Sequence, residues 1–257
     1  MATVLSLHAH PDDEALLTGG WLAQRAAAGD RILLVFATDG EAGLTDASHA
    51  TEPLGRRRRR EALASAKALG AAEVRWLGYA DSGMADAPTP ASTTGSAAGY
   101  CRLVEAPIDE VARAVAAILD EEHVDVLTGY DAHGGYGHPD HVRVHQVARR
   151  AQELSAHRPV LLEATLDKTA IVRLLRVLRP AARLLRGLTL PGDDIYTARA
   201  DLSLRVDVRD HLDAKRRALA AHSSQTGGGI RTIALLLALP RPLARRVLGA
   251  EWFHAVP

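Results

Sequence analysis

The sequence predicts an α/β fold in which a Rossmann-like parallel sheet is flanked by helices. Apolar runs of strand length alternate with helical segments through the first 155 residues, and this alternation is typical of βαβ units. The run at 31–38, Arg-Ile-Leu-Leu-Val-Phe-Ala-Thr, is apolar without a break between its two end residues, as expected of a strand that is buried on both faces. Two polar motifs follow expected strands, which is where open parallel sheets place their ligand sites.

Four elements are expected before residue 70, each for a local reason. Residues 3–8 contain the strand-like run Thr-Val-Leu-Ser-Leu, and residues 31–38 form the second strand. A helix is expected at 12–28, because proline and three acidic residues stand at its start and glycine follows its end. A second helix is expected at 56–69, where Gly70 is placed to adopt the left-handed conformation common at helix C-termini.

The same alternation continues beyond residue 70. Strands are expected at 74–77, which reads Val-Arg-Trp-Leu, and at 123–128. An amphipathic helix is expected at 107–121 and a further helix at 139–154. Residues 85–100 are rich in Ala, Ser, Thr, Gly and Pro, so they predict a long loop near the expected site.

We expect the 257 residues to form a single domain. Residues 1–155 would be the Rossmann-like core that carries both polar motifs, and residues 156–257 a C-terminal elaboration of helices and strand that could act as a lid. Five arginines and one lysine stand among apolar residues at 168–188. A solvated basic face or a lid is the favoured interpretation, and contact with a membrane surface is the alternative. A strand is expected at 195–208 and a helix at 209–221.

Composition restricts the classes of function. Lysine plus arginine equals aspartate plus glutamate, 31 each, so net charge gives no reason to expect nucleic-acid binding. The single cysteine, Cys101, excludes an intrachain disulfide and a cysteine-rich zinc site. No signal segment precedes residue 3, and no stretch approaches the ~18 apolar residues of a membrane span. We expect a soluble cytoplasmic protein without membrane contact, and leave a homo-oligomer open.

Two related motifs indicate a metal site. His10-Pro11-Asp12-Asp13-Glu14 follows the first strand, and Gly137-His138-Pro139-Asp140-His141 follows the strand expected at 123–128. Acids in a first helical turn also complement the helix dipole, but that explanation gives no reason for the histidines. Histidine and aspartate are ligands that suit Zn²⁺. Two such motifs at neighbouring strand ends therefore predict a shared metal centre.

The number of ligands distinguishes a structural site from a catalytic one. Four protein ligands would close a tetrahedral zinc, whereas three leave a position for water, whose pKa then falls toward ~7. The motifs contain enough groups for three ligands and for acid–base residues besides. Spacing does not tell which histidine has which role.

Together these residues resemble the signatures of the LmbE-like (PIG-L) family of de-N-acetylases. The second motif, in the form Gly-Gly-Tyr-Gly-His-Pro-Asp-His from residue 134, is most like the mycothiol-pathway branch of that family. Weaker similarities extend over most of the chain: Asp39-Gly40-Glu41-Ala42-Gly43, Arg58-Arg59-Arg60-Glu61, Leu77-Gly78, Asp81-Ser82-Gly83-Met84 and His222-Ser223-Ser224-Gln225.

The resemblance implies a role for each matching residue. His10, Asp13 and His141 would be the zinc ligands, with Fe²⁺ as the alternative metal. Asp12 would be the general base that activates water. His138 would polarise the acetyl carbonyl and be oriented by Asp140. Residues implied to contact the sugar are Arg58, Asp81 and Tyr136.

The implied activity is zinc-dependent hydrolysis of an N-acetyl group on a small molecule that contains N-acetylglucosamine. A metal-dependent amidase of another amide, such as a thiol conjugate, and an inactive metal-binding scaffold are the alternatives. The presence of Asp12 and His138 beside the ligands argues against the scaffold. A nucleotide-binding module is disfavoured, because no Gly-x-Gly-x-x-Gly follows the first strand.

Overall fold

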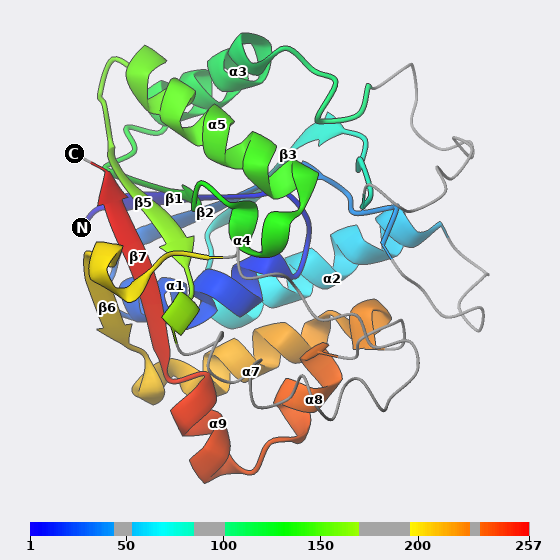
Figure 1. Cartoon of the computed structure of the whole chain (residues 1–257), viewed down its shortest axis with the longest axis vertical. Helices are drawn as coiled ribbons and strands as arrows, with labels where there is room; N and C mark the ends of the chain where they lie inside the picture. The colour runs from blue at the N-terminus through cyan, green and yellow to red at the C-terminus, as the bar shows by residue number, and fades with distance from the viewer. Residues whose placement is uncertain (44–52, 85–100, 170–195, 227–231, 257) are drawn as a thin grey trace.

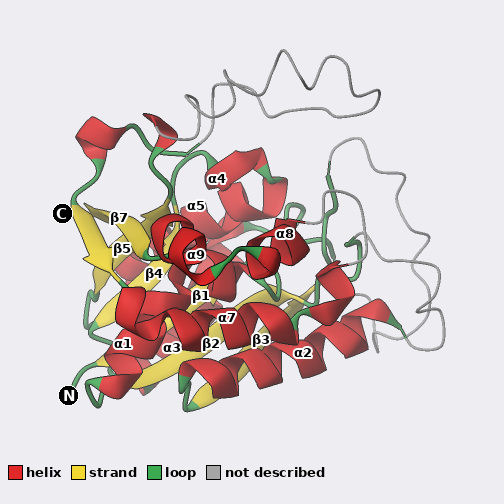
Figure 2. Ribbon diagram, turned by 90° about the horizontal axis from the view of Figure 1, so that it is seen from below, coloured by secondary structure: helices red, strands yellow, loops and turns green. Residues whose placement is uncertain are grey.

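The computed structural model describes residues 1–43, 53–84, 101–169, 196–226 and 232–256. Within these residues a seven-stranded sheet has the order β3-β2-β1-β4-β5-β7-β6, and helices cover both of its faces (Figures 1 and 2). The pairs from β3 to β5 are parallel, whereas β7 runs antiparallel to both β5 and β6. The predicted α/β fold is confirmed, with an antiparallel extension at one edge.

The strands are β1 (Thr3–His8), β2 (Arg31–Thr38), β3 (Glu73–Tyr79), β4 (Val126–Tyr130), β5 (Val160–Thr165), β6 (Leu204–Asp207) and β7 (Ala250–Val256). The helical elements up to residue 154 are η1 (Glu14–Thr18), α1 (Gly19–Ala27), α2 (Leu54–Leu69), α3 (Ile108–Glu121), α4 (Gly134–Gly137) and α5 (Pro139–Leu154). Those that follow are η3 (Arg199–Asp201), η4 (Arg209–His211), α7 (Leu212–Ala221), η5 (Ser223–Thr226), α8 (Thr232–Ala238) and α9 (Arg241–Val247).

Strand β2 shows why the sheet is covered on both sides. Ile32, Leu34 and Phe36 belong to one buried cluster, which includes apolar residues of α1, α2 and α7. The alternate residues Leu33 and Val35 belong to a second cluster with α3 and α5. Because side chains alternate between the faces of a strand, a continuous apolar run places apolar groups on both. The interpretation of 31–38 as a doubly buried strand is confirmed.

The order of the strands reverses between β1 and β4. From β1 the chain continues to β2 and β3 on one side, and then returns to place β4 and β5 on the other. Open α/β sheets have a crevice at the carboxyl ends of the strands at such a switch point. The two polar motifs directly follow β1 and β4, so the topology brings both to this crevice.

The prediction of a helix at 12–28 is wrong about where the helix starts and about its continuity. It begins at Glu14 rather than residue 12, runs as a π-helical turn to Thr18, and resumes as α1 at Gly19. The break has a tertiary cause: the Glu251 carboxylate accepts hydrogen bonds from the backbone N–H groups of Gly20 and Trp21, each at 2.7 Å. A side chain from β7 thus satisfies N–H groups at the start of α1 that have no partner inside the helix.

The C-terminal part was predicted less completely. The strand expected at 195–208 is confined to Leu204–Asp207, and β5, β7, α8 and α9 were not anticipated. Residues 170–188 of the basic segment and the loop at 85–100 lie outside the described residues. None of the helices that the structure describes combines the length and the apolar character needed to cross a bilayer.

The buried pair of Lys215 and Glu251 joins this C-terminal part to α1. The Lys215 ammonium lies 2.6 Å from the Glu251 carboxylate, and both side chains are 2% exposed. Lys215 also donates to the carbonyl of Leu16 at 2.9 Å. Removal of one member would leave the other charge buried without its counter-charge.

We expect Lys215→Met to lower the free energy of unfolding by about 3–5 kcal/mol, the usual effect of breaking a buried ion pair. Urea unfolding measures the change. Arg241→Met is the matched control, because the ion pair of Arg241 with Asp213 is exposed and its loss should be far smaller. Equal losses of unfolding free energy in the two variants would contradict the prediction that the buried pair of Lys215 stabilises the fold more than an exposed pair does.

Candidate metal centre

The first motif forms a tight turn between β1 and η1. His10 and Pro11 continue from the strand, and Asp12 has a backbone φ of 108°, a conformation that L-residues other than glycine seldom adopt. The reversal directs Asp13 back toward β1, where its Oδ2 accepts a hydrogen bond from the backbone N–H of His10 at 3.2 Å. The side chains of His10 and Asp13 therefore face one another.

The second motif combines a glycine turn with a helix N-terminus. The φ of Gly134 is +60°, and a Cβ atom there would lie 2.7 Å from the backbone nitrogen of Val142, so only glycine fits. His138 is the N-cap of α5, and its Nδ1 accepts from the backbone N–H of Asp140 at 3.2 Å. His141, in the first turn of α5, projects from the helix toward His10.

Three donor atoms converge between the motifs. His10 Nδ1 lies 3.3 Å from His141 Nε2, and Asp13 Oδ2 lies 3.5 Å from His10 Nδ1 and 3.3 Å from His141 Nε2. Ligand atoms at ~2.0–2.1 Å from a tetrahedral zinc are about 3.3 Å apart. The spacing and chemistry of these two nitrogens and one carboxylate oxygen therefore fit one divalent cation.

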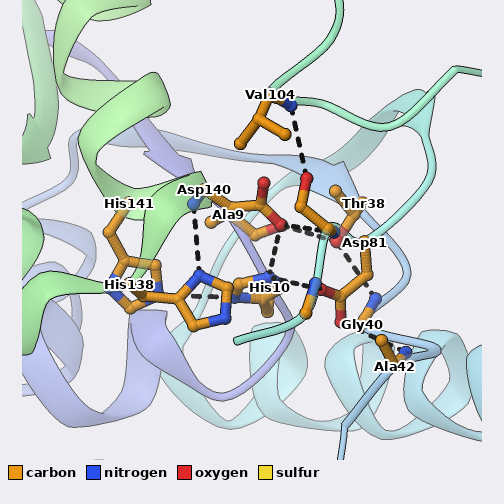
Figure 3. A network of polar contacts seen from close by, with 12 residues as sticks. Ala9, His10, Thr38, Gly40, Ala42, Asp81, Val104, His138, Asp140 and His141 are labelled. Carbon is orange, nitrogen blue, oxygen red and sulfur yellow. Dashed lines mark hydrogen bonds and ion pairs between the residues drawn. The ribbon is translucent and has the colours of Figure 1, made fainter. Parts of the chain in front are cut away.

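The outer nitrogens of both histidines have acceptors. His141 Nδ1 donates to the carbonyl of Gly134 at 3.2 Å, and His10 Nε2 faces Asp140 Oδ2 at 3.2 Å and Asp81 Oδ1 at 3.4 Å. Figure 3 shows the two carboxylates on the side of the His10 ring away from His141. Hydrogen bonds of this kind fix the tautomer and leave the other ring nitrogen free for a metal.

The charges around these histidines favour a cation. Burial alone would lower the pKa of His10, but the nearby carboxylates, Asp81 foremost, raise it well above its usual range. Burial would raise the pKa of Asp13, but the His141 and His10 rings hold it well below its usual value. Asp140 adds a buried oxygen, Oδ1, that has no partner among the described residues. A positive charge at the centre offsets this buried negative charge.

His138 lies beside this group and offers a different nitrogen. His10, His138 and His141 each have a donor atom within 4.8 Å of the others, as do His10, Asp81 and Asp140. The Nδ1 of His138 is occupied by the N–H of Asp140, so a neutral ring carries its proton on Nε2. Burial and the adjacent His10 and His141 rings lower the pKa of His138 to about 4. The ring is thus a neutral donor.

Asp12 has the properties of a base. Its side chain is 19% exposed, and Oδ1 accepts from the Arg58 guanidinium at 3.1 Å. Burial raises the pKa of Asp12 to about 6, although Arg58 opposes the shift. A carboxylate with a pKa near the working pH can take up a proton and release it again.

The predicted sugar-contacting residues occupy three different environments. Arg58 is buried and also donates to the carbonyls of Pro11 and Gly40. The Asp81 carboxylate accepts from the backbone N–H groups of Ala42 and Gly83. Tyr136 is 46% exposed, and its ring stands edge-on to His141. Contact with the sugar stays a prediction for all three residues. Arg58 and Asp81 already have hydrogen-bond partners in the protein, so each would have to bind the sugar in addition to these partners.

Asp140 reaches His138 through its backbone N–H, while its carboxylate faces His10 and accepts from Ser82 N–H at 2.9 Å. Its predicted role in orienting His138 remains a prediction. Asp140 therefore contacts His138 through its backbone and His10 through its side chain.

Tyr130 is a site residue that the sequence analysis missed. Its hydroxyl donates to Asp13 Oδ2 at 2.6 Å and accepts from the N–H of Ala9 at 2.9 Å. Its ring stacks on His141, with centroids 4.2 Å apart. The strand was expected to end at residue 128, whereas β4 continues to Tyr130. The sequence did contain a signal for this role: a tyrosine, which has both a ring and a hydroxyl, stands at a strand end beside the glycine turn.

The comparisons with known proteins show similarity to one family of deacetylases. The family model "PIG-L: GlcNAc-PI de-N-acetylase" matches residues 5–152. The 1D-myo-inositol 2-acetamido-2-deoxy-alpha-D-glucopyranoside deacetylase of Thermobispora bispora is 34% identical over 275 residues, which is 97% of this chain and 86% of the relative.

Solved structures add two similarities. The N,N'-diacetylchitobiose deacetylase from Pyrococcus horikoshii has a TM-score of 0.63 and 25% identity, covering 99% of this chain and 84% of that one. The 4-carboxy-2-hydroxymuconate hydratase GalB from Pseudomonas putida KT2440 has a TM-score of 0.60 and 17% identity, covering 100% and 97%. At that identity the likeness concerns the fold alone.

We expect Tyr130→Phe to weaken metal binding by about 10–100-fold, the usual effect of losing a hydrogen bond to a ligand. The variant keeps the ring that stacks on His141 and removes the hydroxyl, which donates to Asp13 and accepts from the N–H of Ala9. Competition with a chelator measures the affinity. Tyr79→Phe, at the end of β3, is the control; equal affinity in Tyr130→Phe and Tyr79→Phe would contradict the role of the hydroxyl.

Proposed function

The chain belongs to the PIG-L family of GlcNAc-PI de-N-acetylases, and from this premise we propose that it hydrolyses the N-acetyl group of an N-acetylglucosaminyl-inositol. It is a deacetylase, a hydrolase that acts on an amide bond. Water adds to the acetyl carbonyl, the C–N bond breaks, and the products are acetate and the free amine of the sugar. The observation that carries the proposal is a converging set of two histidines and one carboxylate, with Asp12 and His138 beside it.

We propose that His10, Asp13 and His141 hold the metal. Two imidazoles and one carboxylate suit Zn²⁺, and the same set is used for Fe²⁺; we propose Zn²⁺, which elemental analysis of the purified protein identifies. When bound, the cation supplies Lewis-acid polarisation and lowers the pKa of water.

The remaining steps belong to the side chains. Arg58 holds Asp12 Oδ1 at 3.1 Å, which leaves Oδ2 to take the proton from the attacking water. His138 carries a proton on Nε2 and donates it as a hydrogen bond to the carbonyl oxygen, where negative charge develops. Such a donor is most valuable in the transition state, because its interaction strengthens as charge accumulates. Asp12 then returns the proton to the leaving nitrogen.

Tyr136 is placed to meet the substrate. Its half-exposed ring stands next to both histidines of the second motif. We propose that it contacts the acetylated sugar, with Arg58 and Asp81 contributing from the floor of the site.

The metal-loaded protein should release acetate from N-acetylglucosaminyl-inositol with a higher kcat/KM than from free N-acetylglucosamine, because binding of the inositol contributes to positioning. An amine-reactive fluorophore measures the free amino group. A thiol conjugate of glucosaminyl-inositol is the second substrate to test. Hydrolysis of the thiol conjugate alone would show an amidase instead, and metal binding with no hydrolysis would show a scaffold.

The two histidines of the second motif should respond differently to removal. We expect His141→Ala to lose the metal, because it removes a ligand. His138→Ala should keep the metal while kcat falls by ~10²–10³, the usual effect of losing one oxyanion donor, and KM changes less. Elemental analysis and steady-state kinetics measure both. A metal-free His138→Ala, or a fully loaded His141→Ala, would contradict this assignment.

A further inference from the structure

We propose that Glu14 and His222 are positioning residues, which hold the backbone of Asp12 in the conformation that its carboxylate needs to act as a base. The proposal rests on the proposed function, in which Asp12 Oδ2 receives the proton of the attacking water. The hydrogen bonds of the two side chains run to Asp12, to Ser65 and to each other. Both act on Asp12 through hydrogen bonds.

The turn at Asp12 needs an external restraint. Its φ of 108° is unfavourable for a residue with a Cβ atom, and such conformations persist only where the surroundings impose them. The N–H of Asp12 points to Glu14 Oε2 at 2.9 Å, and its carbonyl accepts from the N–H groups of Ala15 and Leu16, each at 3.1 Å. The carboxylate of Glu14 thus holds the N–H of this peptide unit, while its carbonyl, that of Pro11, accepts from Arg58.

Glu14 is itself held firmly by donors on its second oxygen. Oε1 accepts from Ser65 Oγ at 2.5 Å and from His222 Nε2 at 2.6 Å. The side chains of Glu14 and His222 are fully buried. Oε1 thus has two donors, and the position of the carboxylate depends on the His222 ring.

His222 is anchored from a distant part of the sequence. It follows α7, and the next residues are fixed to α2: Ser223 Oγ and Ser224 N–H donate to Glu61 Oε1, each at 2.9 Å, and Ser224 Oγ donates to Oε2 at 2.6 Å. A second hydrogen-bonded path from α2 to Asp12, beside the contacts of Ser65 with Glu14 and of Arg58 with Asp12, therefore runs through this segment. The C-terminal part of the chain is in this way coupled to the turn that carries the base.

The variant pair His222→Phe and His222→Gln tests the proposal. Phenylalanine keeps the buried ring but removes the donor, whereas the glutamine amide restores a donor to Glu14. We expect kcat of His222→Phe to fall about 10–100-fold, as for other residues that orient a functional group. KM and metal content should change little. His222→Gln should recover most of kcat.

Hydrogen exchange of the Asp12 amide gives a readout that does not depend on activity. The exchange rate, measured by NMR, should rise in His222→Phe and return toward the wild-type rate in His222→Gln. Arg241→Met is the control, because its exposed ion pair with Asp213 involves neither Glu14 nor Asp12. Its kcat and Asp12 amide exchange should stay close to wild type. If His222→Phe does not fold, Ser65→Ala takes its place as the test variant, because it removes the other donor to Glu14 Oε1.

A double-mutant cycle with Asp12→Asn separates positioning from general damage. If Glu14 and His222 act through Asp12, His222→Phe should change the residual rate of Asp12→Asn by less than twofold. An equal fold-loss in both backgrounds would overturn the proposal, as would unchanged kcat and amide exchange in His222→Phe. If wild-type protein hydrolyses no amide, the proposed function fails, and the exchange measurement still decides whether His222 holds the turn.

Discussion

The parallel pairing of β1 with β4 is the constraint on which the site depends. The register places Val4 opposite Val126 and Ser6 opposite Thr128, so the two strands reach the carboxyl edge of the sheet together and deliver their motifs to one point. Side chains alternate along a strand, so a slip of one residue would exchange the two faces and separate His10 from His141. The apolar clusters on both faces, of which Leu5, Leu7 and Val4 are members, therefore fix the geometry of the polar site as well as the stability of the core.

A second requirement is charge balance. Asp13, Glu14, Asp81 and Asp140 are all at most 9% exposed, and buried carboxylates are tolerated only when paired or hydrogen-bonded. Arg58 and His222 are the partners of the carboxylates on the side of the turn that holds Asp12. His10 and His141 are the partners on the side where the donor atoms converge, and there carboxylates lie on both sides of the His10 ring. A cation there is consistent with the electrostatics that the fold already requires, so metal binding and folding should be coupled.

The sequence predicted the parts of this arrangement that are local. The alternation of strands and helices, the left-handed Gly70 after α2, and the convergence of the two motifs follow from short stretches of residues. Long-range contacts were not predictable in this way. The carboxylate of Glu251 interrupts the first helix from β7, and Tyr130 contributes because β4 runs two residues past its expected end. Strands β5 and β7 complete the sheet, but β7 pairs with residues about ninety positions earlier, a separation that periodicity does not reveal.

The contrast between ligands and base explains why the C-terminal part matters. His10 and His141 are oriented by groups that lie in or next to the motifs, with Asp81 added from the end of β3. Asp12 is different, because its backbone is held in an unfavourable conformation, and strain of that kind must be balanced by contacts elsewhere. Those contacts come from Glu14, and through it from Ser65 on α2 and His222 beyond α7. A metal site can be built from two strand ends, but a carboxylate beside it that is free to accept a proton requires further support, which comes from α2 and, beyond residue 200, from His222.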